Sequence, residues 1–411
     1  MTTDAKESRF YAGLMTGTSM DAIDVVIISA NKETIKEIYH SRRRGISCDD
    51  EPDSGVKLIA SSSLPMPDHL RSELEYCIDT GTQSFDNRAE RPYNTHHPSL
   101  FHRLLNARRE LTELAGHAYA QCLKSAEQKV GDTLAIEACG CHGQTLFHIP
   151  GFASWQLFDS ALFAVQNSVR VISNFRDKDI ALGGQGAPLA PLFHQFIFGY
   201  LGQNACAVNI GGISNISMWR DDLRGWDIGP GNRLMDAWMQ QHFNCSFDED
   251  GEIARANQVN ANLLSQMLME PYFSITGAKS TGRELFNLTW LSSHLAALDL
   301  ENPNQEEAGS ILSTLTELTA LTIAKTLSEH DLNEAVLCGG GAKNTYLRER
   351  ILSNSNNTAI RTSNSIGYDG QLIEGMAFAF FACLRDLQLP AAIASVTGAT
   401  KDSVCGSVFE P

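Results

Sequence analysis

One stretch near the start of the chain, residues 10–30, constrains the fold more than any other. Two apolar runs, Phe10–Met15 and Val25–Ala30, favour β-strands, and the segment TGTSMDAID between them is rich in small, hydroxyl and acidic residues. The pattern predicts a β-hairpin with a polar turn. Gly17 would let the backbone approach a ligand closely. On these residues alone, an ordinary tight turn is an equal alternative.

The predicted turn carries groups that suit a phosphate and a cation. Thr18 and Ser19 offer backbone amides and hydroxyls, which can hold a phosphate. Asp21 and Asp24 offer carboxylates, which can hold a hydrated cation beside it. The segment matches neither a Walker loop nor a GxGxxG turn, so the common phosphate motifs do not cover it.

Composition excludes several classes of protein. The 411 residues are enough for two ordinary domains, and a net charge of −16 argues against nucleic acid or an anionic membrane as a partner. No run of 18 apolar residues occurs, so we expect no transmembrane helix. The ten cysteines show no metal-finger spacing, and the N-terminus has no apolar signal core. These features predict a cytoplasmic protein with reduced thiols.

A second strand–turn–strand pattern occurs in the second half of the chain. Ala205–Ile210 and Ile216–Trp219 are apolar runs, and the segment GGISN lies between them. The turns at Gly17 and Gly211 therefore follow the same logic. An internal duplication with one phosphate-binding hairpin in each half explains both.

Two further predicted strands end in polar clusters, which is where α/β sheets place ligand groups. Leu134–Cys139 leads to His142 and Gln144, which could hydrogen-bond a hydroxylated substrate. A loop histidine with an ordinary structural role is equally consistent with these residues.

The strand Val169–Phe175 leads into a segment whose glycines and prolines fix an irregular path. Arg176, Asp177 and Asp179 lie at its start. One of the two acids in such a rigid loop is a candidate general base. A solvated charge cluster is the alternative.

Four later segments have distinct local signals. The strand Ala335–Cys338 runs into a triple glycine and a helix N-terminus, which suits a nucleotide phosphate or sugar edge. Asn232 is expected to cap the helix from Arg233 to about Phe243. The basic turn 279–283, KSTGR, could contact phosphate or sugar, although most such turns are surface features. The helix Ile373–Leu384 combines small and apolar residues, which permits close backbone packing.

Together these motifs resemble the anhydro-N-acetylmuramic acid kinase family, within the actin-like ATPase and sugar kinase superfamily. The matching pieces run in family order from residue 13 to about 406, and only about 35–126 lacks a clear match. They are MTGTSMDAID, HGQTLFH, FRDKDIALGGQGAPLAP, NIGGISNI, DIGPGNRLMDAW, KSTGRELFN, CGGGAKN, EGMAFAF and VTGATKDSVCG.

The resemblance implies an α/β fold with two RNase-H-like (actin/hexokinase-type) domains flanking a central cleft. The domains would be 1–204 plus about 373–411, and 205–372. It implies a kinase that uses ATP and Mg²⁺ to hydrolyse the 1,6-anhydro bridge of anhydro-N-acetylmuramic acid and phosphorylate O6. The product would be N-acetylmuramate 6-phosphate, in cell-wall recycling.

The resemblance also implies roles for individual residues. Asp179 matches the base that activates water, and His142 and Glu374 match sugar-side positions, with Gln144 beside them. Asp21 is the candidate Mg²⁺ ligand. The implied nucleotide-binding residues are Gly17, Thr18, Ser19, Met20, Asp21, Ala22, Ile23, Asp24, Gly211, Gly212, Asn215, Gly339, Gly340 and Gly341, with Gly339–Ala342 at the adenosine end.

Four residues depart from the usual family pattern. Ala22 stands where glycine is usual, Asn174 where an acid is usual, and Gly370 and Gln371 where proline and aspartate are common. Two other functions therefore stay open: a kinase of the same superfamily acting on another amino or anhydro sugar, and a weakened sugar- or nucleotide-binding regulatory protein. The expected partner is a small sugar, with neither nucleic acid nor membrane, and a homodimer stays open.

Overall fold

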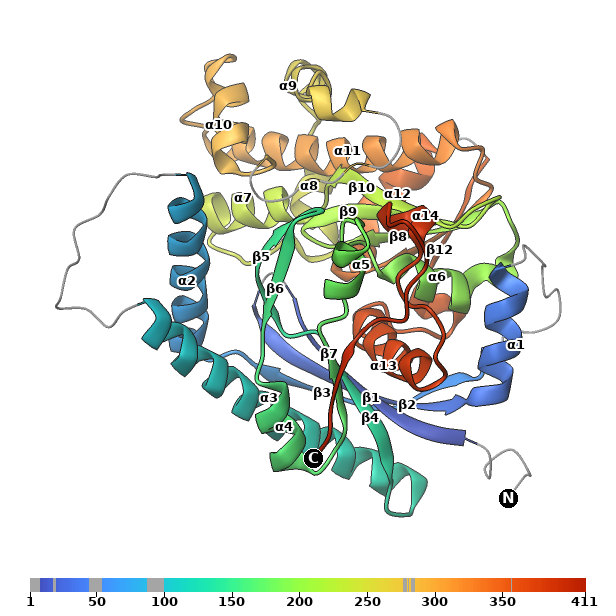
Figure 1. The fold of residues 1–411 in the computed structure, drawn as a ribbon. Coiled ribbons are helices and arrows are strands. Elements are labelled where there is room, and N and C mark those ends of the chain that lie inside the picture. Colours follow the sequence, from blue (N-terminus) through green and yellow to red (C-terminus); the bar gives the residue numbers. More distant parts are fainter. Residues whose placement is uncertain are drawn as a thin grey trace. The chain divides into compact units, whose positions relative to one another are not determined.

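A computed structural model defines the fold of the chain (Figure 1). It describes residues 8–17, 20–43, 54–86, 100–275, 279, 281, 285–355 and 357–411, with the backbone alone for 43 and 81–86. The chain divides into two compact units. The first unit is Met1–Arg44, Glu51–Phe193 and Glu374–Pro411, and the second is Gly45–Asp50 and His194–Ile373.

The first unit is built on a six-stranded sheet with the order β13-β7-β4-β1-β2-β3. Its first three strands form an antiparallel meander, β4 and β7 continue parallel to β1, and β13 closes the edge. A separate hairpin joins β5 and β6. The strands are β1 (Ser8–Thr16), β2 (Ala22–Asn31), β3 (Val56–Pro65), β4 (Ile136–Cys141), β5 (Gln144–Ile149), β6 (Ala153–Leu157), β7 (Val171–Ser173) and β13 (Ser407–Phe409).

The predicted hairpin is confirmed, because β1 and β2 pair from Ser8↔Asn31 to Thr16↔Ile23. The strand β3 pairs with β2 and completes the meander. It lies within residues 35–126, where the family resemblance was weakest. That region therefore contributes to the sheet itself, in addition to any surface insertion.

The second unit repeats the same strand order in a five-stranded sheet, β10-β9-β8-β11-β12. Here too an antiparallel meander is followed by two strands parallel to its first strand. The common order confirms the predicted duplication of the strand–turn–strand pattern. The strands are β8 (Ala205–Ile210), β9 (Ile213–Met218), β10 (Arg224–Pro230), β11 (Glu334–Cys338) and β12 (Ala359–Thr362).

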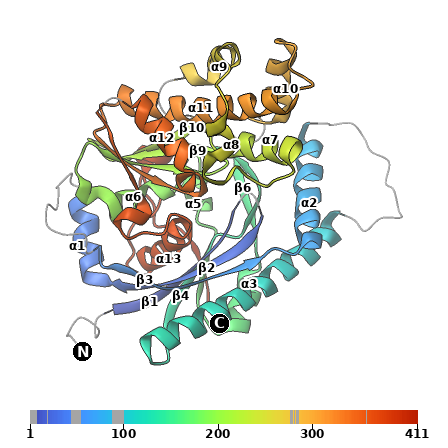
Figure 2. The same ribbon diagram turned by 180° about the vertical axis from the view of Figure 1, so that it is seen from behind.

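Helices cover both faces of the first sheet (Figures 1 and 2). The long helix α3 packs on β2 and β3, and α13 lies on the other face. The packing of α13 is close because Gly13 and Gly140 lack side chains: a Cβ at either position would overlap the backbone of α13. The helices are α1 (Lys32–Arg43), α2 (Asp68–Asp86), α3 (Leu100–Val130), α4 (Ser160–Asn167), α5 (Asp177–Ala181), α13 (Ile373–Asp386) and α14 (Ala394–Thr397), and α6 (Ala190–Phe198) contains the division between the units.

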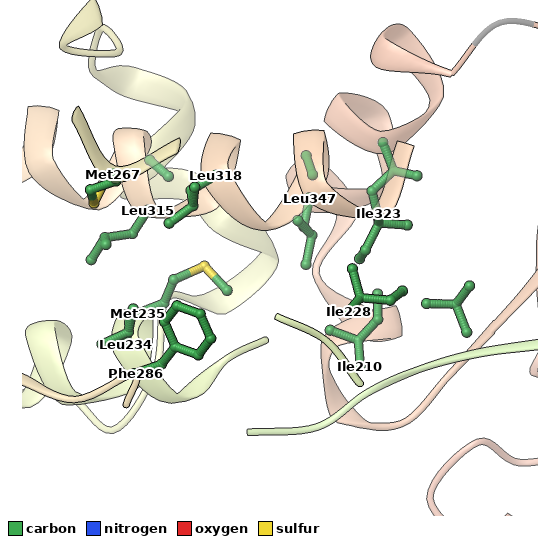
Figure 3. Packing of buried hydrophobic residues seen from close by; sticks show 14 of the residues in the cluster. Ile210, Ile228, Leu234, Met235, Met267, Phe286, Leu315, Leu318, Ile323 and Leu347 are labelled. Carbon is green, nitrogen blue, oxygen red and sulfur yellow. The ribbon is translucent and has the colours of Figure 1, made fainter. Parts of the chain in front are cut away.

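The core of the second unit forms around α11, which packs on β10 and on four other helices. Leu315, Leu318 and Ile323 of α11 meet buried side chains from the sheet and from α7, including Ile210 and Met235 (Figure 3). None of the helices in the described part of the chain is long and apolar enough to span a bilayer. The helices are α7 (Arg233–Phe243), α8 (Glu252–Ala256), α9 (Ala261–Leu268), α10 (Leu288–Ala296), α11 (Gln305–Glu329) and α12 (Thr345–Asn354).

Candidate active site

In the first unit, candidate residues gather where the parallel strands β1, β4 and β7 end. Gly17 follows β1, His142 follows β4 and Arg176 follows β7. The amide of His142 donates to the carbonyl of Leu14 (3.1 Å), which ties the end of β4 to β1. Parallel strands present their carboxyl ends at one edge of a sheet, so segments far apart in sequence become neighbours there.

The guanidinium of Arg176 connects two segments at this edge of the sheet. Its Nη1 donates to the carbonyl of Gly186 (2.9 Å), and its Nη2 lies 2.9 Å from His142 Nε2. Because arginine can only donate, His142 Nε2 must accept, and the imidazole proton is assigned to Nδ1. Burial, and then Arg176, lower the pKa of His142 to about 3, so the ring is neutral.

Three buried polar atoms near Arg176 have no hydrogen-bond partner among the described residues. They are His142 Nδ1, Gln144 Oε1 and His148 Nδ1. Burial, and then Arg176, lower the pKa of His148 to about 4. Buried polar groups are normally paired, so these atoms mark a place where a polar ligand can bind.

Sequence reasoning missed His148 as a site residue. It is the second histidine of HGQTLFH and lies on β5, which begins at Gln144. The motif itself was the signal, because it places Gln144 and His148 on the strand that follows the His142 turn.

Glu374 begins α13 and interacts electrostatically with both Arg176 and Asp24. The net shift of the Glu374 pKa is upward. Desolvation by the surrounding protein raises this pKa most, Asp24 also raises it, and Arg176 lowers it. The side chain is nevertheless exposed to solvent. Burial raises the pKa of Asp24, and a hydrogen bond with Ser63 partly offsets this rise. The edge therefore combines one arginine with two carboxylates of raised pKa.

Asp179 is fully buried and held by two hydrogen bonds. The hydroxyl of Thr397 donates to Oδ1 (2.7 Å), and the backbone amide of Gly186 donates to Oδ2 (2.8 Å). A Cβ at Gly184 would overlap this carboxylate. The carboxylate thus has one defined orientation, which favours a positioned group over a solvated charge.

Asp177 differs sharply from Asp179. Both residues lie in the short helix α5, and not in an extended chain. Side chains two residues apart in a helix point to different faces of it. Asp177 is exposed, whereas Asp179 faces the interior. The two carboxylates cannot take each other's place.

The first hairpin turn is described at Gly17 and from Met20 onward, and Thr18 and Ser19 lie outside the described residues. Met20 has a positive φ of 54°, whereas Ala22 begins β2 opposite Pro65. The methyl of Ala22 therefore fits the backbone. Asp21 is exposed and Ile23 is buried in the sheet.

The second unit has a different kind of site, made of glycine turns. Gly211 and Gly212 join β8 to β9, with Asn209 opposite Asn215 across the hairpin. The turn after β10 is hydrogen-bonded to this hairpin turn. The backbone amide of Gly231 donates to the carbonyl of Gly212 (3.0 Å), and that of Asn232 donates to the carbonyl of Gly211 (2.8 Å).

A third turn, after β11, packs against the same place. Gly339 has a φ of 82°, and a Cβ there would overlap Asn209 Oδ1. At Gly341 a Cβ would overlap Ile210 and Asn232 Oδ1. These contacts require glycine and bring Gly211, Gly339 and Gly341 together at the carboxyl ends of β8 and β11. Gly340 lies between them in the turn, beside Asn232 Nδ2.

Asn232 occupies the N-cap position of α7, as predicted, but the expected side-chain cap does not form. Its side chain makes no capping hydrogen bond, and its backbone is already helical (φ −74°, ψ −25°). The amide group lies beside the Gly341 turn instead. Among the departures from the family pattern, Asn174 adopts φ 58°, which asparagine tolerates, and Gln371 accepts a hydrogen bond from Lys343 (2.6 Å).

Two sheets share the order of five strands, one with Arg176 and a buried Asp179 after its parallel strands and the other with packed glycine turns. This arrangement defines a protein of the RNase-H-like, actin/hexokinase type. The model of the family described as anhydro-N-acetylmuramic acid kinase matches residues 9–411. The chain belongs to the anhydro-N-acetylmuramic acid kinase family.

Curated relatives of that name cover nearly the whole chain. The protein from Hahella chejuensis is 36% identical over 98% of this chain and 99% of its own. The one from Sulfurimonas denitrificans is 35% identical over 98% and 100%, and the one from Haemophilus influenzae is 36% identical over 98% of each.

Among solved structures, one distant likeness is to a sugar kinase. A ROK family glucokinase from Streptomyces griseus, in complex with glucose and AMPPNP, aligns over 90% of this chain and 98% of its own with a TM-score of 0.36 and 9% identity. The fold type is therefore taken from the strand order and the family, and not from that alignment.

Proposed function

We propose that this protein is an ATP-dependent kinase that hydrolyses the 1,6-anhydro bridge of anhydro-N-acetylmuramic acid and phosphorylates O6. The product is N-acetylmuramate 6-phosphate. The observation that carries the proposal is the family match over residues 9–411, supported by relatives of that name at 35–36% identity over 98% of the chain. The geometry of the first unit supports the assignment of roles.

The proposed base is Asp179. It takes a proton from water, the water oxygen bonds to C1 of the sugar, and the bond from C1 to the bridging O6 breaks. O6 then bonds to the γ-phosphorus of ATP, and ADP leaves. Each carboxylate oxygen of Asp179 accepts one hydrogen bond and has a second lone pair, which would accept the water once sugar and water occupy the site. The two bonds fix the carboxylate, which is what a general base requires.

The proposed sugar contacts are the polar atoms without partners. His142 Nδ1–H donates, and Gln144 Oε1 accepts. Glu374, beside Arg176, would bind sugar hydroxyls. These groups suit the hydroxyl and amide groups of an acetylated amino sugar.

The proposed nucleotide contacts lie on both hairpins and on the turn after β11. Gly17, the segment Thr18–Asp24, Gly211, Gly212 and Asn215 would bind the phosphates, and the turn Gly339–Ala342 would bind the adenosine end. Phosphoryl transfer depends mainly on positioning and charge neutralisation, and backbone amides at glycine turns provide both.

The residues present fit Mg²⁺ in the manner usual for ATP. In the described part of the chain, no group of three His, Cys, Asp or Glu side chains is arranged to hold a metal. Mg²⁺ is commonly held by one or two carboxylates together with the nucleotide phosphates. The exposed Asp21 would supply the carboxylate, and the ion would neutralise charge on the phosphates.

We infer a cytoplasmic location from the thiols. Nine cysteines in the described part of the chain are free, and eight of these are buried. Free buried thiols are typical of a reducing compartment. A homodimer stays an expectation, which sedimentation velocity of the purified chain would test.

The decisive experiment supplies purified protein with ATP and anhydro-N-acetylmuramic acid in ¹⁸O-labelled water. We expect ADP and a 6-phosphate that carries one ¹⁸O at C1. N-acetylglucosamine and N-acetylmuramic acid serve as comparison substrates. Faster phosphorylation of either one, without ¹⁸O incorporation, would contradict the proposal and favour an ordinary sugar kinase. Nucleotide and sugar binding without turnover would favour a regulatory protein.

A further inference from the structure

The second unit contains a cavity of about 290 Å³ that shares no residue with the glycine turns. Its walls come from the edge strand β10, the segment around Ile275 and the last turns of α11. The helix α11 ends at Glu329, just before β11 begins, whereas Gly339 follows the end of β11. The cavity therefore lies apart from the proposed nucleotide contacts of this unit.

Two lysines give the cavity a positive wall. Lys279 Nζ donates to the carbonyl of Tyr272 (3.1 Å) and lies 4.5 Å from the centre of its ring. Burial, and then the charge of Lys325, lower the pKa of Lys279. Two like charges on one cavity repel each other, and an anion between them would remove that repulsion.

One carboxylate lies on the same wall. Glu329 is 3.7 Å from Lys325, and both side chains are more than half exposed, so the pair is weak. Burial lowers the pKa of His330. The nearby arginines Arg220 and Arg224 also lower this pKa, whereas the carboxylates Glu329 and Asp331 raise it, and the net shift is downward. With His330 neutral, the two lysines outnumber the single acid in a protein whose overall charge is −16.

The hydroxyls on the wall can only accept hydrogen bonds from a ligand. Thr322 Oγ1 donates to the carbonyl of Thr319 (3.0 Å), and Thr326 Oγ1 donates to that of Thr322 (2.9 Å). Their protons are thus committed to the helix backbone, and both residues line the cavity, where their hydroxyl oxygens can still accept. A ligand that matches them has hydroxyl or amide donors of its own.

The remaining wall is aromatic and aliphatic. Trp226 and Phe273 line the cavity with Ile228, and the rings of Trp226 and His330 lie 5.1 Å apart. Flat aromatic faces pack well against the C–H face of a sugar ring. The volume is just below the range of about 300–1,000 Å³ for drug-sized ligands, so it fits one monosaccharide and not a nucleoside triphosphate.

We propose that this cavity binds a monosaccharide that carries a phosphate group, with Lys279 and Lys325 at the phosphate and Thr322 and Thr326 at the hydroxyls. A phosphorylated amino sugar is also the class of product proposed for the reaction. If that proposed function holds, the cavity would report the product concentration; the binding itself does not depend on it.

The test is isothermal titration with N-acetylglucosamine 6-phosphate. Lys325→Gln should weaken binding about tenfold, the worth of one charge-assisted hydrogen bond. Thr326→Val, which keeps the shape, should weaken it by a smaller factor of about three. The control is Lys124→Gln, an exposed lysine on α3 of the first unit, which should bind as wild type does. Turnover of Lys325→Gln should match that of wild type.

Three outcomes would overturn the proposal. The first is absence of binding up to about 10 mM, which is weaker than any useful affinity. The second is binding that Lys325→Gln and Thr326→Val leave unchanged, because the probe would then occupy the reaction site. The third is equally tight binding of inorganic phosphate, because the cavity would then recognise an anion without the sugar. None of these measurements depends on kinase activity, so each is distinct from failure of the proposed function.

Discussion

The two sheets of this protein share one strand order and carry opposite chemistry at the ends of their strands. The first unit places charged groups there, with Arg176 beside His142 and a buried Asp179 in the short helix α5 that follows. The second unit places packed glycines and amides there, and Asn232 is its principal polar side chain. The scaffold therefore fixes where a site lies, and the turn residues decide what the site can do.

Glycine itself serves different purposes in the two units. In the first, Gly13 and Gly140 lie within strands and let the backbone of α13 approach the sheet. In the second, Gly231, Gly339 and Gly341 lie in turns that pack against one another. The first use supports a helix, and the second forms a surface of backbone groups that suits phosphate.

The largest expected effect falls on the acidic site. Asp179→Asn preserves shape and removes the base, so turnover should fall about 10²-fold or more while nucleotide binding persists. The matched control is Asp177→Asn, two residues away and exposed, which should lose much less. Steady-state kinetics and nucleotide titration on both variants check this. Near-wild-type turnover in Asp179→Asn would remove the residue from the mechanism, and lost ATP binding would make its role structural.

Buried histidines that stay neutral in the folded protein should make the free energy of unfolding depend on pH, by about 2 kcal/mol for one residue. The pKa of His142 is lowered to about 3 in the folded protein, from an ordinary value near 6.5. Below pH 6.5 the unfolded chain binds a proton that the folded protein does not, so stability falls as pH falls toward 3. Between pH 6.5 and 5 one such histidine costs roughly 2 kcal/mol of unfolding free energy.

Urea unfolding at pH 7 and pH 5 measures this dependence. His142→Gln, which keeps an acceptor for Arg176, should lose the share of the pH dependence that belongs to His142, roughly 2 kcal/mol, whereas His148 and His194 keep theirs. In the second unit, burial lowers the pKa of His194 to about 4, and His194→Gln is the matched variant there. An unchanged pH dependence in His142→Gln would show that the Arg176 pair does not hold the imidazole neutral.

A smaller effect is expected in the glycine turns. A Cβ at Gly341 overlaps Ile210 and Asn232, so Gly341→Ala should displace the turn and raise the KM for ATP about tenfold. The kcat should change little, because Asp179 and its partners are untouched. Gly202→Ala serves as a control, since its Cβ meets nothing nearby, although its positive φ adds backbone strain. A loss of kcat without a change in KM would contradict the assignment of the turn to nucleotide binding.

The smallest effect is expected at Ala22. Among the described residues of this turn Met20 has a positive φ and Ala22 does not, so Ala22 fits its place at the start of β2. Ala22→Gly should cost about 0.5–1 kcal/mol of stability and leave ATP affinity nearly unchanged. Kinetics and thermal unfolding of the variant check both values. A large gain in activity would mean that Ala22 impairs the enzyme and would favour the weakened regulatory protein.

Sequence reasoning found most secondary structure in the motif regions. The predicted helix from Arg233 to about Phe243 is α7, and the strand Ala335–Cys338 is β11 apart from one residue. The prediction failed where an element lacked a motif. β3, for example, contains three consecutive serines and lies outside the matching motifs, so no strand was predicted there, and it pairs with β2 along its length.

In the candidate site too, local motifs were predicted from the sequence, whereas contacts between distant residues were not. The sequence singled out the HGQTLFH and FRDKD motifs, but the pairing of Arg176 with His142 joins residues 34 positions apart. The partner of Asp179 is more distant still: Thr397 lies 218 positions away, in the closing VTGATKD segment. Asn232 is the N-cap residue of α7, as its sequence position indicates, but its side chain lies beside the Gly341 turn and makes no capping hydrogen bond.

The sequence by itself determined the hairpins, the glycine turns, the principal helices and the family, because these follow from the order of neighbouring residues. Only the tertiary structure decided that Asp179 is buried between Thr397 and Gly186, that His148 has an unpaired nitrogen near Arg176, and that β3 completes the first sheet. The physical reason is that backbone preference acts over a few residues, whereas burial and side-chain pairing depend on which distant segments the folded sheet brings together.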